Sequence, residues 1–227
     1  MALNEQKLAE SLSARFGLSL SGCAVSAKDG VRYGIRAADI PSPNGFMIQI
    51  ATGWKSIEAS FVPDNYAGEL IRAMGNSSQE ARSLFHALTE SFNELGNRIT
   101  LAINGSLIPD TSMLPPAPWN KFDLSIRKLA DMVTDDNEVL QRRVEDIGTA
   151  CLALTLSLLP LEEAEDTVMP LFEGGLPEGA CTTVTVNRYE RSPVNRAACI
   201  AAHGAVCKVC GFEFGKIYGQ LGQGYIE

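Results

Sequence analysis

The sequence predicts an α+β fold, in which helices and an antiparallel-type sheet form one N-terminal domain over residues 1–160. Three observations carry this prediction. Apolar residues recur every three or four positions in some segments, as on one face of a helix, and every second position in others, as on one face of a strand. Finally, residues 147–161 are almost continuously apolar, which predicts a buried helix. The chain contains no internal repeat, Walker loop or GxGxxG motif.

The first helix is expected in the segment NEQKLAESLSARFG, where Leu8, Leu12 and Phe16 are spaced four residues apart and Gly17 ends the helix. Three strands are expected next, in VRYGIRAA, GFMIQIA and SIEASFV. A PSPNG turn precedes the second strand and a TGW break precedes the third. In SIEASFV the apolar residues alternate with polar ones, as a half-buried antiparallel strand requires.

Two helices are predicted in NYAGELIRAMG and SSQEARSLFHALTESFNELG, ended by Gly75 and Gly96. Ser77 and Glu80 have the spacing of a capping box, in which side chains bond the free amides at a helix start. The apolar stripe of the second helix consists of Leu84, Leu88, Phe92 and Leu95. His86 lies off this stripe with no Cys or second His near it, which favours a surface position over a metal ligand.

Two further alternating segments, RITLAING and KFDLSIRK, predict strands joined by a proline-rich loop. Trp119 in this loop is interpreted as a packing anchor, with base stacking as the less favoured alternative. A long helix is predicted from about Asn137 to Leu159, after acidic residues that suit a helix N-terminus. Cys23 and Cys151 are interpreted as single thiols in or near the core.

The net charge of −8 is distributed unevenly along the chain. Residues 1–130 carry twelve basic and twelve acidic side chains, residues 131–180 two against twelve, and residues 181–227 five against three. The segment PLEEAEDTVMPLFEGGLPEGA is acidic and carries three prolines, so residues 161–180 are interpreted as a linker. Overall acidity argues against non-specific coating of nucleic acid, which needs phosphate neutralisation, but it allows one basic C-terminal module.

The sequence predicts a cytoplasmic protein without a membrane span. The N-terminus MALNEQKLAE lacks the basic start and apolar run of a signal peptide. The longest apolar stretch is shorter than the about 20 residues that a membrane helix needs. Six cysteines without an export signal are expected to be reduced.

Residues 181–227 differ in character from the rest of the chain. A short strand, TTVTV, leads into a basic segment, and a helix is expected from Pro193 to about His203, with Gly204 as its cap. The candidate DNA-phosphate contacts are Arg188, Arg191 and Arg196. Solvated charge on a helix face is the alternative for each of these arginines.

Cys207 and Cys210 form a C-x-x-C motif, and Gly211 allows the tight turn of a zinc knuckle. Two thiolates at this spacing can hold one zinc ion, although a structural site needs four ligands. A redox pair and two ordinary thiols are the alternatives, the redox pair being less favoured because the motif follows a helix. Cys199 and His203 share a helix face and could complete a Cys3His site; packing on the inner side of that helix is the alternative.

The stretch VNRYERSPVNRAACIAAHGAVCKVCGFEFGKIYGQLGQGYIE resembles the entry into the HNH endonuclease domain of bacterial restriction-type nucleases. The family pattern is an arginine-rich helix ending in a CIxxHG-like stretch, then C-x-x-C-G-F-x-F, then YGxxGxGYIE. The match covers about 42 residues almost continuously. Two earlier segments, EASFVPDNYAGELIRAMG and LAINGS, also resemble the N-terminal half of some such nucleases.

The resemblance implies that residues 181–227 are the first part of a ββα-metal domain, with Cys207 and Cys210 as ligands of a structural zinc. In the family the catalytic histidines, an asparagine loop and a second C-x-x-C follow this point. None of these groups is in the sequence, so no catalytic residue is assigned and the chain alone is expected to be inactive. A catalytic divalent metal is expected only in a longer form.

Three functional interpretations therefore remain open. The leading one is an incomplete HNH restriction-type endonuclease whose N-terminal domain recognises DNA. The second is a non-enzymatic binding module whose tail forms a Cys3His zinc ribbon from Cys199, His203, Cys207 and Cys210. The third adds a homodimer, formed through the helix of residues 137–159 or through thiolates pooled from two chains.

Overall fold

The computed structural model describes residues 5–25, 31–38, 40, 42–129, 137–160, 200, 204–206 and 211–219. Within them the protein has an α+β fold, as the sequence predicts. The expected linker, residues 161–180, and most of the expected C-terminal segment lie outside the described residues. No described helix is long and apolar enough to cross a membrane.

Seven strands form one sheet in the order β1-β2-β3-β4-β7-β5-β6, and every neighbouring pair is antiparallel. The first four strands follow one another as a meander, whereas β7 enters between β4 and β5 and joins the two halves of the sheet. The strands are β1 (Leu20–Val25), β2 (Val31–Ala37), β3 (Phe46–Thr52), β4 (Ser56–Pro63), β5 (Asn97–Ile103), β6 (Ser106–Leu107) and β7 (Phe122–Leu129).

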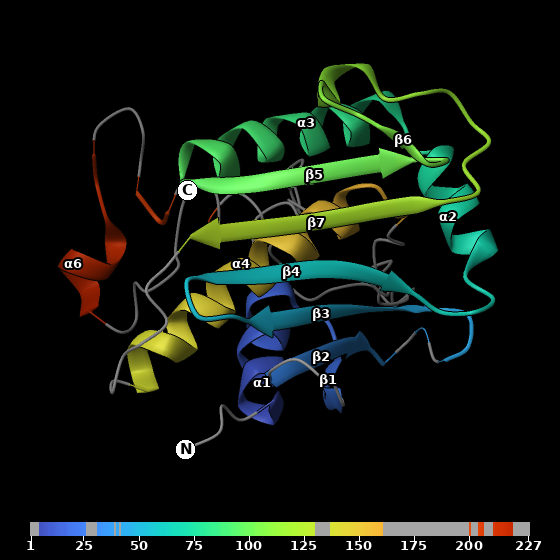
Figure 1. Ribbon diagram of the computed structural model, residues 1–227. Helices are drawn as coiled ribbons and strands as arrows, with labels where there is room; N and C mark the ends of the chain where they lie inside the picture. Colours follow the sequence, from blue (N-terminus) through green and yellow to red (C-terminus); the bar gives the residue numbers. More distant parts are fainter. Residues whose placement is uncertain are drawn as a thin grey trace, which may run out of the picture.

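The helices of the domain cover one face of this sheet and leave the face towards the viewer bare (Figure 1). Helix α4 runs behind the central strands, with α1 and α3 beside it, and α2 lies at one end of the sheet. A short 3-10 turn, η1, precedes β7, and α6 belongs to the C-terminal segment. Their bounds are α1 (Glu5–Phe16), α2 (Gly68–Gly75), α3 (Gln79–Glu94), η1 (Thr111–Met113), α4 (Asn137–Ser157) and α6 (Phe214–Tyr218).

The core lies between the sheet and α4. Every residue of α4 from Ile147 to Ser157 is buried, so the predicted buried helix is confirmed and ends within two residues of its expected end. Gly148 lets the helix approach β3 closely, because a Cβ there would lie 2.8 Å from Ile50 Cδ1. Cys151 is buried in this helix, as predicted. The apolar residues of α4 from Ile147 to Ser157 therefore pack within the core.

The structure differs from the sequence prediction at β1 and at the start of α3. The segment LSGCAV forms β1, which was not predicted because its glycine and small residues carry little strand signal. The N-cap of α3 is Ser78, whose hydroxyl accepts from the Ala81 amide at 3.2 Å. The Ser77–Glu80 capping box is thus wrong by one residue, and the Ser77 hydroxyl is buried without a hydrogen-bond partner among the described residues.

The residues of α3 that face the core also differ from the apolar stripe that the sequence predicts. Phe85 is fully buried whereas Leu95 is 50% exposed, because the helix ends at Glu94 and Leu95 follows it. His86 is half-buried rather than on the surface, and its Nδ1 lies 2.9 Å from Thr111 Oγ1 of η1. This polar contact across to η1 accounts for a histidine at this position.

Trp119 is the packing anchor that the sequence predicts. Its side chain is fully buried, its indole Nε1 donates to the Pro115 carbonyl at 3.0 Å, and its ring stacks on Phe122. Helix α2 packs directly on the ring at Gly75, where a Cβ would lie 2.8 Å from Trp119 Cγ. The guanidinium of Arg82 lies over the same ring, 5.4 Å from its centre.

We predict that Gly75→Ala lowers the free energy of unfolding by about 1–3 kcal/mol, because the new methyl group overlaps a fixed indole ring. Urea denaturation measures the change. Gly68→Ala in the same helix is the matched control, since no atom would lie within 4 Å of a Cβ at that position, and it is expected to change stability by less than about 1 kcal/mol. Equal stabilities of the two variants would contradict the packing of α2 on Trp119.

Candidate functional site

The site residues that the sequence predicts lie outside the described residues, so the structure does not place them. They are Arg188, Arg191, Arg196, Cys199, His203, Cys207 and Cys210. Among the described residues no group of three or more His, Cys, Asp or Glu side chains could hold a metal ion.

The described parts of the tail show two glycines in the left-handed region. Gly204 has a φ of 72°, and its amide donates to the Ile200 carbonyl at 2.8 Å, as expected for the glycine that ends a helix. Gly211, next to the C-x-x-C motif, has a φ of 71°. After it, the rings of Phe212 and Phe214 make an edge-to-face contact at 4.9 Å.

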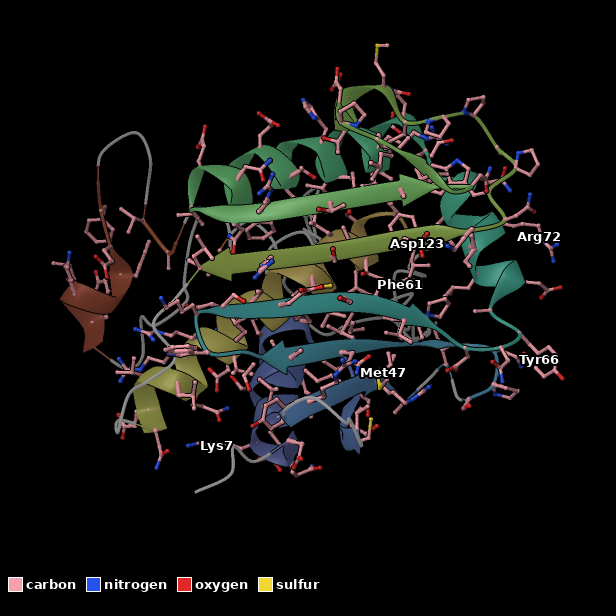
Figure 2. The ribbon with its side chains drawn as sticks, viewed as in Figure 1. Lys7, Met47, Phe61, Tyr66, Arg72 and Asp123 are labelled. Carbon is pink, nitrogen blue, oxygen red and sulfur yellow. The ribbon has the colours of Figure 1, made fainter. Side chains whose placement is uncertain are left out.

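One face of the sheet is bare in the described domain, and we call it the open face. It consists of the outward residues of β2, β3, β4, β7 and β5. Met47 and Asp123 belong to it, whereas Tyr66 and Arg72 project from the end of the molecule where α2 lies (Figure 2). No described helix covers this face (Figure 1).

Small and polar residues form the centre of the open face. The strand register aligns one outward residue from each of five adjacent strands in a row: Gly34, Gln49, Ser60, Ser125 and Thr100. At the β2 end, Cys23 and Met47 approach across Gly34, with 3.6 Å between the two sulfur atoms. A Cβ at Gly34 would lie 2.5 Å from each sulfur, so glycine is required there. Burial raises the pKa of the Cys23 thiol.

Arginines predominate among the charged residues of the open face. Four arginines face two carboxylates, which gives a formal excess of two positive charges. The arginines are Arg32, Arg36, Arg98 and Arg127, and the carboxylates are Glu58 and Asp123.

Three of these arginines, Arg32, Arg98 and Arg127, form no ion pair within the described residues but differ in their hydrogen bonds. Arg127 donates to Ser56 Oγ at 3.2 Å. Arg32 has its Nε buried without a hydrogen-bond partner, and neither Arg32 nor Arg98 forms an ion pair within the part of the chain that the structure describes. Their positive charge is therefore available to an anionic partner.

The fourth arginine, Arg36, forms a two-point ion pair with Asp64 at the end of β4. The Asp64 carboxylate also accepts from the Gly45 amide at 3.1 Å, and its side chain is only 9% exposed. The Arg36 hydrogen bond lowers the pKa of Asp64, and the same bond raises the pKa of Arg36. This pair therefore fixes the loop between β2 and β3 against β4.

Comparison of the chain with protein-family models, with curated proteins and with solved structures found no match in any of the three.

The open-face arginines were missed by sequence reasoning, although a signal for them was present. In RITLAING and KFDLSIRK the outward positions are those that alternate with the apolar residues, which places Arg98 and Arg127 on the same face. The pairing of β5 with β7, and of β7 with β4, is what brings them together. Strand order is a long-range property that alternation alone does not reveal.

We predict that Asp64→Asn lowers the free energy of unfolding at pH 7 by about 2 kcal/mol, as loss of a charged hydrogen bond does. Because the folded pKa of Asp64 is lowered, its contribution is present above the ordinary pKa of about 3.9 and is lost as the pH falls through the folded value. Urea denaturation at pH 7 and pH 3 should show the difference between wild type and variant shrinking at pH 3.

Asp123→Asn is the control for this experiment, since both side chains of the Lys121–Asp123 ion pair are exposed to solvent. Such a pair contributes less than about 1 kcal/mol. If Asp64→Asn lowers the free energy of unfolding by the same amount at pH 3 as at pH 7, the contribution of Asp64 to stability does not depend on its charge.

Proposed function

We propose that this protein is a DNA-binding part of an HNH-type restriction endonuclease, with an N-terminal α+β recognition domain and the first zinc knuckle of the nuclease domain. The observation that carries the proposal is the continuous resemblance of residues 186–227, from the arginine-rich segment through C-x-x-C-G-F-x-F to GYIE. We place the protein in the cytoplasm, where DNA is its partner. The earlier EASFVPDNYAGELIRAMG segment contributes β4 and α2 to the domain.

The zinc part of the proposal rests on two thiols and one glycine. Cys207 and Cys210 would hold the metal, and Gly211 supports the fit because its positive φ supplies the turn that a knuckle needs after its second thiolate. Bound zinc would stabilise the fold of the tail and supply no hydrolytic chemistry. Gly204 precedes the C-x-x-C motif in the sequence, Gly211 follows it, and helix α6 begins at Phe214.

Hydrolysis of a phosphodiester needs a base that activates water and a cation that stabilises the leaving oxygen. Residues 211–227 contain no histidine, and His203 precedes the knuckle. We therefore assign no catalytic residue to this chain and expect no cleavage by it alone. In the proposal, the role of this chain's own residues is to bind DNA.

The DNA-recognition part of the proposal is supported by the charge difference between the two sides of the domain. The open face carries four arginines and two carboxylates, whereas the helices α1, α3 and α4 carry eight acidic and five basic residues. A phosphate backbone is attracted to the first side and repelled by the second. Small side chains in the central row leave the backbone of a duplex room to approach Arg98 and Arg127.

A second function is a non-enzymatic binding module with a Cys3His zinc ribbon. The observation that favours it is the hydrogen bond from the Gly204 amide to the Ile200 carbonyl, which is helical in its spacing. A helix at this place would bring Cys199 and His203 to one face, close to the two thiols of the C-x-x-C motif. Metal stoichiometry separates the two functions.

We predict that the purified chain holds less than one zinc ion per molecule, because the knuckle of the leading proposal supplies only two ligands. Atomic emission on wild type, Cys207→Ser and the control Cys23→Ser measures the content. One tightly held zinc per chain, lost in Cys207→Ser and kept in Cys23→Ser, would instead establish the Cys3His ribbon. Size measurement with and without a chelator would detect two chains that pool their thiolates.

We predict that the double substitution Arg98→Gln and Arg127→Gln weakens binding of a short DNA duplex about tenfold and lowers the slope of log affinity against log salt by about 2. Fluorescence anisotropy over a salt series measures both. The pair Arg142→Gln and Arg143→Gln on α4 is the matched control and should leave binding unchanged. Loss only on replacing Arg188, Arg191 and Arg196 would move the DNA contact to the tail.

A further inference from the structure

A cavity of about 210 Å³ lies on the helix-covered side of the sheet, away from the open face. It lies where the ends of α1 and α3 and the middle of α4 meet strands β5 and β7. Its polar wall consists of Arg15, Asn97, Lys128, Asp146 and Thr149, and Phe92 contributes to its apolar wall. Drug-sized sites have volumes of about 300–1,000 Å³, so this cavity suits a smaller molecule.

Arg15 is held in place by the helix opposite it. Its Nη1 donates to Thr149 Oγ1 at 3.0 Å, and the Thr149 hydroxyl donates in turn to the Glu145 carbonyl at 2.6 Å. Thr149 is 1% exposed, so the acceptor of the arginine is part of the core. One edge of the guanidinium is thereby fixed, and its other N–H groups remain for a ligand.

Lys128 is unusual because the alternation of β7 places it on the covered face. Leu124 and Ile126, at the two preceding positions of the same face, are buried, and the cross-strand neighbours of Lys128 are Ile57 and Asn97. Lysines in such positions are normally paired. Within the residues that the structure describes, however, the Lys128 ammonium has no carboxylate within 4 Å.

Asp146 supplies the one negative charge at the cavity. It lies about one turn before Thr149 on α4. Its side chain is partly exposed to solvent and also lines the cavity. Burial raises the pKa of its carboxyl, against the opposing effect of Arg15 and Lys128, and the nearby Glu145 carboxylate, which does not line the cavity, raises it further. Neither cation forms an ion pair with it among the described residues, so the two cations and one carboxylate give the described lining a formal charge of +1.

We propose that this cavity binds a small oxyanion, a phosphate or carboxylate group at the end of a compact molecule, between the Arg15 guanidinium and the Lys128 ammonium. Two half-buried cations that share a single carboxylate in the lining, without a direct ion pair among the described residues, are costly unless a further anion joins them. Arginine and lysine together supply the charged N–H donors that bind such groups most strongly. The apolar wall at Phe92 then accepts the short body of the ligand. This site is independent of the proposed DNA binding, because it lies on the opposite side of the sheet.

Isothermal titration of the full chain with inorganic phosphate and with butyrate, at constant ionic strength in chloride, tests the proposal. We expect saturable binding of at least one probe at one site per chain. Lys128→Gln should weaken it about tenfold or more, as loss of one charged hydrogen bond does. Lys121→Gln is the matched control: it replaces a lysine that immediately precedes β7 and pairs with Asp123, and it should leave binding unchanged.

Asp146→Asn provides a second variant whose expected effect is opposite in sign. Removing the carboxylate should tighten binding of the same probe several-fold, and a variant that merely unfolds could not give this result. The proposal is overturned if neither probe binds saturably, if Lys128→Gln and Lys121→Gln bind alike, or if Asp146→Asn binds more weakly than wild type. DNA binding measured on the same variants should not change, so failure here leaves the nuclease proposal standing.

Discussion

Burial of α4 against the sheet is the constraint on which the rest of the fold depends. The helix lies across the central strands, where Gly148 gives it a close approach to Ile50 of β3. Its buried hydroxyls do not go unpaired: Thr155 donates to the Cys151 carbonyl at 2.9 Å and Ser157 to the Leu154 carbonyl at 2.9 Å. Local bonds of this kind let polar residues enter an apolar helix without the cost of an unsatisfied group.

The position of α4 gives the two faces of the sheet different chemistry. The face that it covers takes most of the apolar residues of the alternating strands, and the bare face takes most of the small and polar residues together with four arginines. Because antiparallel sheets can be solvated on one side, no second layer is required for stability. The closing strand β7 enters between β4 and β5, so residues distant in sequence meet on both faces.

The local sequence pattern predicts most of the helices and strands, whereas the remaining features depend on contacts between residues that are distant in the sequence. Five strands, four helices and the Trp119 anchor follow from spacing and turn residues in the sequence. Strand β1 did not, because LSGCAV is a strand for tertiary reasons: Gly22 lies against the Glu5 carbonyl, where a Cβ would come within 2.4 Å. The cavity could not be predicted either, since Arg15, Lys128 and Asp146 come from three elements that meet only in the fold.

Adjacent residues of β7 connect the two surfaces to which function is proposed. Arg127 points to the open face and Lys128 to the cavity, so a shift of one residue in the β4–β7 register would exchange an exposed charge for a half-buried one. The register is fixed instead by the buried Ile126 between Ala59 of β4 and Ile99 of β5. Each charge can therefore be replaced without disturbing the other, and the two surfaces can be tested separately in one protein.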